Sequence, residues 1–187
     1  SFALKLNDKI LKECKVRGVS FEIIADIQYN KIVADVTKPE VNQDVMKLEK
    51  APKIAVYSPK NKQPWDDAVT LVMTYAEIPY DVVYDEEILK EGLSKYDWLH
   101  LHHEDFTGQY GKFWSSYKNA AWFREYVRFN EGLAGKLGYK KVSDLKLAVA
   151  IKIKNFVSQG GFMFAMCAAT DSYDIALAAQ NVDICKS

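Results

Sequence analysis

The chain has few of the residues that define disulfide-rich proteins. It contains only three cysteines, Cys14, Cys167 and Cys185, and no two of them form a C-x-x-C pair. An odd number at these spacings predicts neither a disulfide framework nor a structural zinc site. A fold that does not need disulfides mildly favours a reducing compartment.

Long apolar runs and an excess of one charge are also missing. No apolar run approaches the roughly 18 residues of a transmembrane helix, so we predict no membrane span. Lys+Arg and Asp+Glu both number 25, and without a basic stripe we predict no nucleic-acid partner. The chain opens at Ser1 with neither a methionine nor a secretory signal, so we expect remaining parts of a longer parent protein. The default location is cytoplasmic, or the cell envelope if that parent carries a signal peptide.

The length of 187 residues suits a single domain with one substantial core. Within it we distinguish an N-terminal segment, residues 1–50, from an α/β core, residues 51–187. The N-terminal segment predicts a helix over Leu4–Val16 closed by Gly18, a short strand over Val19–Ala25, a helix from Asp26 to about Val36 and then a polar connection.

From Pro52 onward, strand-like and helix-like segments alternate. The predicted strands are Lys53–Tyr57, Tyr80–Tyr84, Tyr96–Leu101 and Phe162–Met166. The predicted helices are Trp65–Ala76 with Asp66 and Asp67 in its first turn, Glu86–Leu93, about Lys112–Leu137, and Ser143–Ser158 with Ser143 as N-cap. This alternation predicts an α/β fold with parallel strands, right-handed crossovers and helices on both faces. Ligands of such sheets bind beyond the carboxyl ends of the strands.

Cys167 lies where an apolar strand meets a helical pattern. The small residues Ala168 and Ala169 follow it, and helical spacing begins near Ser172. A nucleophile on a sharp strand-to-helix turn has this layout, and the N–H groups of the next helix would favour a thiolate there. A buried cysteine at the end of a core strand is the equally weighted alternative.

All three histidines follow one another at the end of the third strand. His100 and His102 share a face if the strand continues, and with Glu104 they could bind a metal. Backbone-bonded imidazoles are the favoured interpretation, so we predict no metal site. His102 or His103 could instead act as base for Cys167, with Glu104 or Asp105 orienting the ring.

The segment after these histidines combines glycines with aromatic residues. Asp105, Gly108, Tyr110 and Trp114 could form a binding loop in which backbone approaches a ligand. An ordinary loop held by aromatic packing is the competing interpretation.

Two segments resemble the core of class I glutamine amidotransferase-like domains. The stretch Tyr96-Asp97-Trp98-Leu99-His100-Leu101-His102-His103 is similar to that superfamily's strand YDxLxLxGG, and Ala165-Met166-Cys167-Ala168-Ala169 is similar to its elbow GxCxG. Residues from about Ala51 to Cys185 look closer still to a bacterial group often labelled asparagine synthetase B. The chain has neither the N-terminal cysteine nor the phosphate-binding glycine loop of asparagine synthetases, so that label implies no activity here.

The resemblance implies a flavodoxin-like open parallel sheet and a small-molecule substrate with a carbonyl such as a side-chain amide. It implies Cys167 as nucleophile and the backbone N–H of Ala168, with the strand end at His102 and His103, as oxyanion donors. It implies no cofactor. The superfamily's histidine and glutamate after the elbow have no counterpart, because no histidine follows His103. Only Cys167 therefore carries over as a catalytic position, and we expect weak or absent activity.

Two other functions remain open. One is a non-enzymatic module that binds a small molecule, a sugar or a partner through the loop from His102 to Trp114. The other is a metal-assisted hydrolase that uses His100, His102 and Glu104.

Overall fold

The computed structural model describes residues 7–38, 40, 51–59, 68–110 and 113–182. The chain divides into two compact units, Ser1–Ala51 and Pro52–Ser187. Each unit is described by itself.

Two exposed helices make up the described part of the first unit. These are α1 (Asp8–Val16) and α2 (Asp26–Val36), and neither contains a buried residue. The Asn7 side chain caps α1 by accepting a hydrogen bond from the Ile10 N–H at 3.0 Å. The strand predicted over Val19–Ala25 is wrong, because the described part of this unit offers no second strand with which it could pair.

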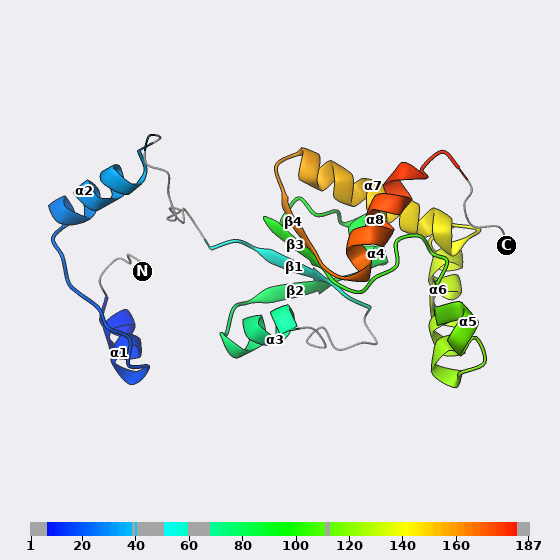
Figure 1. Cartoon of the computed structure of the whole chain (residues 1–187), viewed down its shortest axis with the longest axis horizontal. Helices are drawn as coiled ribbons and strands as arrows, with labels where there is room; N and C mark the ends of the chain where they lie inside the picture. Colours follow the sequence, from blue (N-terminus) through cyan, green and yellow to red (C-terminus); the bar gives the residue numbers. More distant parts are fainter. Residues whose placement is uncertain (1–6, 39, 41–50, 60–67, 111–112, 183–187) are drawn as a thin grey trace. The chain divides into compact units, whose positions relative to one another are not determined.

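Four strands of the second unit form one parallel sheet. They are β1 (Ile54–Tyr57), β2 (Tyr80–Val83), β3 (Trp98–Leu101) and β4 (Phe162–Ala165), in the order β2-β1-β3-β4 (Figure 1). Every pairing is parallel, so the predicted arrangement of these four strands is confirmed. The four residues of β1 are buried, as expected for a parallel strand covered on both faces.

Helices cover both faces of this sheet, as predicted. Helix α3 (Ala68–Tyr75) packs its Met73 against Ile54 and Val56 on one face. The opposite face carries the larger core, formed with α4 (Asp85–Lys90), α7 (Val142–Ser158) and α8 (Ala168–Ala178) (Figure 1). This topology is compatible with a flavodoxin-like fold.

Two helix predictions need correction. The helical stretch predicted over Lys112–Leu137 is two helices, α5 (Phe113–Tyr117) and α6 (Ala121–Lys136), because the chain turns between them. Helix α7 starts at Val142 after an extended Lys141, so Ser143 is not its N-cap. Asp66 and Asp67 lie outside the described residues.

A buried ionic cluster lies at the carboxyl ends of β1 and β2. Lys146 of α7 is 1% exposed, and its Nζ lies 2.9 Å from Asp85 Oδ2. The same nitrogen donates to the hydroxyls of Tyr57 at 2.9 Å and Tyr84 at 3.0 Å. Tyr57 donates in turn to Asp85, and Tyr84 donates to Asn130 Oδ1 at 3.1 Å. One ammonium group thus joins α7 to the ends of two strands.

The charges in this cluster determine its protonation. Burial alone would lower the pKa of Lys146, but the carboxylates of Asp85 and Glu104 outweigh burial and raise that pKa. Burial raises the pKa of Tyr57 and Tyr84 well above the usual value, and the neighbouring carboxylates raise both further. Lys146 is therefore charged and both phenols are protonated at neutral pH, which is the state in which each of these hydrogen bonds has a donor and an acceptor.

Replacement of Lys146 tests how much this cluster contributes to stability. Lys146→Met leaves the Asp85 carboxylate buried without its cation, so we expect a loss of about 3–5 kcal/mol in the free energy of unfolding. Lys152→Met, at an exposed position of the same helix, should cost less than about 0.5 kcal/mol. Urea unfolding measures both. Similar small losses in the two variants would contradict a structural role for the ion pair.

Candidate functional site

Cys167 occupies a sharp turn between β4 and α8. It is the N-cap residue of α8, with φ 51° and ψ −134°, and its side chain is exposed. A positive φ is uncommon for a residue with a β-carbon, and among the described residues it occurs at only two other non-glycine positions, Glu77 and Tyr110. Strain of this kind persists only where surrounding structure imposes it, and it concentrates at functional sites.

Backbone hydrogen bonds hold this turn against the end of β3. The N–H of Ala169 donates to the carbonyls of His102 at 3.1 Å and Met166 at 3.2 Å. Ala169 is fully buried, so a larger side chain would have no room at this position. The N–H of Ala168 is the first of α8 and has no carbonyl partner within the helix. Among the described residues we see no acceptor for it elsewhere.

A buried serine provides the second anchor of α8. The Ser172 hydroxyl donates to the Glu104 carbonyl at 2.9 Å and accepts from the Phe106 N–H at 3.2 Å. With the bond from Ala169, it fixes the first turns of α8 to the chain that leaves β3. The sequence places Ser172 only near the start of a helical pattern, because no local pattern shows that its hydroxyl meets a segment 66 residues earlier.

The histidines extend from β3 beside this turn. His100 is fully buried and stacks on Phe164 of the neighbouring strand, with ring centroids 5.7 Å apart. His102 stacks on His100 at 6.3 Å and lies 3.4 Å from the ring of the exposed His103. Strands β3 and β4 are neighbours, which is the condition for His102 or His103 to approach Cys167. In the described structure the Cys167 sulfur makes no hydrogen bond to either ring.

Glu104 contributes its charge to the buried cluster of Lys146. Its side chain is buried, and its charge acts on Tyr84 and Lys146. Among the described residues, no three His, Cys, Asp or Glu side chains gather closely enough to hold a metal ion. His100, His102 and Glu104 therefore do not form the three-ligand metal set considered from the sequence.

Three residues of the loop considered for binding make contacts within the protein. Asp105 Oδ1 accepts from the Thr107 N–H at 2.8 Å. A β-carbon on Gly108 would lie 2.6 Å from the Ser143 backbone nitrogen. Tyr110 packs edge-on against the rings of Phe123 at 5.9 Å and Tyr126 at 5.8 Å. Trp114 differs from these three, because it is 52% exposed.

Gly108 allows a close approach that can be tested against a matched glycine. Gly108→Ala should destabilise the protein by about 2 kcal/mol or more, because it adds overlap with α7 to the strain of φ 68°. Gly138→Ala carries φ 85° with no atom within 4 Å of the new β-carbon, and should cost about 1 kcal/mol. Thermal unfolding measures the stability lost in each variant. An equal loss in both would contradict a steric overlap between residue 108 and Ser143.

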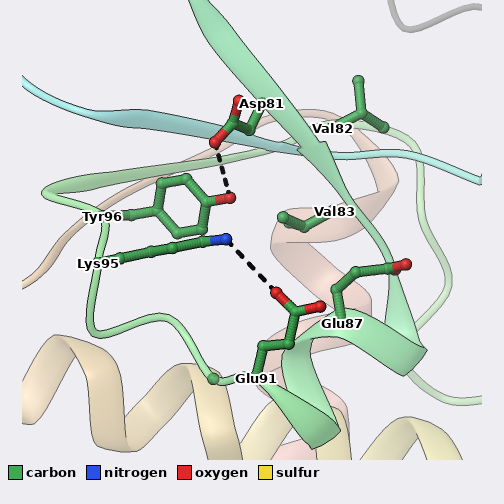
Figure 2. A pocket seen from close by; sticks show the side chains of 8 residues that line it. Asp81, Val82, Val83, Glu87, Glu91, Lys95 and Tyr96 are labelled. Atoms are coloured by element: carbon green, nitrogen blue, oxygen red, sulfur yellow. Dashed lines mark hydrogen bonds and ion pairs between the residues drawn. The ribbon is translucent and has the colours of Figure 1, made fainter.

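Two hollows lie away from Cys167. One, of about 320 Å³, lies beside β2 and α4 and includes Asp81, Glu91, Lys95 and Tyr96 (Figure 2). Its polar groups pair with each other: the Tyr96 hydroxyl donates to Asp81 at 3.0 Å, and Lys95 lies 3.4 Å from Glu91 (Figure 2). The other, of about 520 Å³, includes Trp114 and lies along α5 and α6.

The chain matches no protein-family model, no curated protein and no solved structure. None of the described helices has the length and apolar character needed to cross a membrane.

Proposed function

We propose that the second unit is a class I glutamine amidotransferase-like domain in which Cys167 acts as a nucleophile towards carbonyl carbon. The observation that carries this proposal is the positive φ of an exposed cysteine between a parallel strand and a helix. The same layout places the nucleophile in other strand-turn-helix enzymes. The strand order β2-β1-β3-β4 supports it, because ligands of such sheets bind at this edge.

The chemistry expected here is acyl transfer to sulfur. The Cys167 thiolate attacks the carbonyl carbon, a C–S bond forms, and the bond from carbon to the leaving amine or alcohol breaks. The exposed sulfur lies at the N-terminal end of α8. The N–H of Ala168 is the donor for the developing oxyanion. A leaving amine also needs a proton, which His102 or His103 would have to supply from the end of β3.

The alternative of a binding module that uses the loop from His102 to Trp114 has less support. Gly108 is explained by its contact with Ser143, and Tyr110 by its ring contacts. These roles account for the unusual backbone of the loop without a ligand.

Reactivity of the three cysteines tests the first requirement of this proposal. Cys167 should react with iodoacetamide at neutral pH faster than Cys14 or Cys185, because its thiol is exposed at a helix N-terminus. Mass spectrometry of the digested protein locates the label. Labelling of Cys14 or Cys185 while Cys167 stays unmodified would contradict the proposal and indicate that Cys167 is unreactive.

We further expect no useful hydrolysis of glutamine by this chain. Loss of a general base typically costs about 10²- to 10⁴-fold in rate, and the superfamily's histidine after the elbow is missing. A p-nitrophenyl ester has a leaving group that departs without a proton, so it should still acylate Cys167.

Ammonia release from glutamine and nitrophenolate release from the ester are the two measurements, with Cys167→Ala as control. Ester acylation that persists in Cys167→Ala would contradict the proposed nucleophile. Ammonia release that depends on Cys167 would instead show that His102 or His103 acts as an effective base.

A further inference from the structure

A hollow with basic and aromatic lining lies along α5 and α6, apart from Cys167. Its volume is about 520 Å³, within the range of small-molecule sites. Trp114, Phe123 and Val127 contribute apolar surface, while Lys118, Arg124 and Arg128 contribute positive charge. Figure 1 shows α5 and the start of α6 on the far side of the unit from β2 and α3.

One aromatic side chain of this hollow, Trp114, is exposed while another, Phe123, is buried. Phe123 is 1% exposed and forms the base on which Trp114 packs edge-on, with ring centroids 6.1 Å apart. The Trp114 indole nevertheless leaves 52% of its surface to solvent. A large aromatic side chain held against a buried ring offers a rigid apolar face at low cost in conformational entropy.

Among the described residues, the cations that line this hollow have no acidic partner. Arg124 and Arg128 lie one turn apart on α6, and both are exposed. Within the described structure no carboxylate lies within ion-pair distance of Lys118, Arg124 or Arg128, although Glu125 and Glu131 belong to the same helix. The Arg128 Nε donates to the Arg124 carbonyl at 3.4 Å, which uses one of the five N–H donors of that guanidinium.

We propose that this hollow binds a small organic anion. Its carboxylate or phosphate would lie between Arg124 and Arg128, and its apolar body would pack on Trp114. Guanidinium groups recognise such oxyanions through paired, charge-assisted hydrogen bonds. The apolar lining adds favourable burial for the rest of the molecule.

The concave shape favours a small ligand over a membrane surface. Arg124 and Arg128 lie one turn apart on α6, and both line the hollow. Aromatic and basic residues that bind a lipid surface must all reach one plane. The proposed site does not depend on the role of Cys167.

Calorimetric titration of the full chain with 1-naphthyl phosphate tests this inference. We expect saturable binding that weakens at least about tenfold in the double variant Arg124→Gln and Arg128→Gln. Trp114→Leu should also weaken binding, and inorganic phosphate should bind less tightly than the naphthyl ester. The matched control is the double variant Lys152→Gln and Lys154→Gln, which removes two exposed charges of α7 and should change affinity less than about twofold.

Several outcomes would overturn the proposal. One is no saturable binding of 1-naphthyl phosphate. Another is equal weakening in both double variants, which would indicate a general charge effect. A third is flotation with phosphatidylglycerol vesicles that depends on Arg124 and Arg128 without binding of the soluble ester, which would assign the surface to a membrane. Circular dichroism shows whether each variant keeps its fold. If the double arginine variant does not fold, the affinity of Trp114→Leu for 1-naphthyl phosphate tests the proposal instead.

Discussion

The buried pair of Lys146 and Asp85 is the interaction on which the arrangement of the second unit depends. It brings α7 to the ends of β1 and β2, and the charge of Glu104 draws the chain after β3 into the same cluster. Burying these charges is costly, so replacement by well-packed apolar residues could be as stable. The contacts of Lys146 with Tyr57, Tyr84 and Asp85 join α7 to the ends of both strands.

Contacts between the chain after β3 and the start of α8 hold the turn that contains Cys167. The chain after β3 is held at Glu104, whose carbonyl accepts from Ser172 of α8. The start of α8 is held again by the bond from Ala169 to His102. These two anchors lie just after Cys167, whose φ is positive. The exposed thiol of Cys167 therefore lies at a strained turn between two segments that these contacts hold in place.

Periodicity alone was sufficient to predict the sheet. The four apolar segments between Lys53 and Met166, separated by helical patterns, have one common solution in parallel βαβ units. The strand predicted over Val19–Ala25 failed because its apolar residues show only a propensity to be extended. A strand exists when another strand supplies hydrogen-bond partners, and none is described in that unit. Ser143 is not the N-cap, because α7 already begins at Val142 after an extended Lys141.

The sequence by itself determined the α/β class, the parallel strands and the position of Cys167 between a strand and a helix. These features depend on residue spacing along the chain, which the sequence contains. Only the tertiary structure decided the partners of Lys146, the burial of Glu104 and the contact of Gly108 with Ser143. It also decided that Trp114 lies beside two arginines of α6 in one hollow. The first three depend on segments distant in sequence that meet because the sheet and its helices have packed, and the last depends on the turn between α5 and α6.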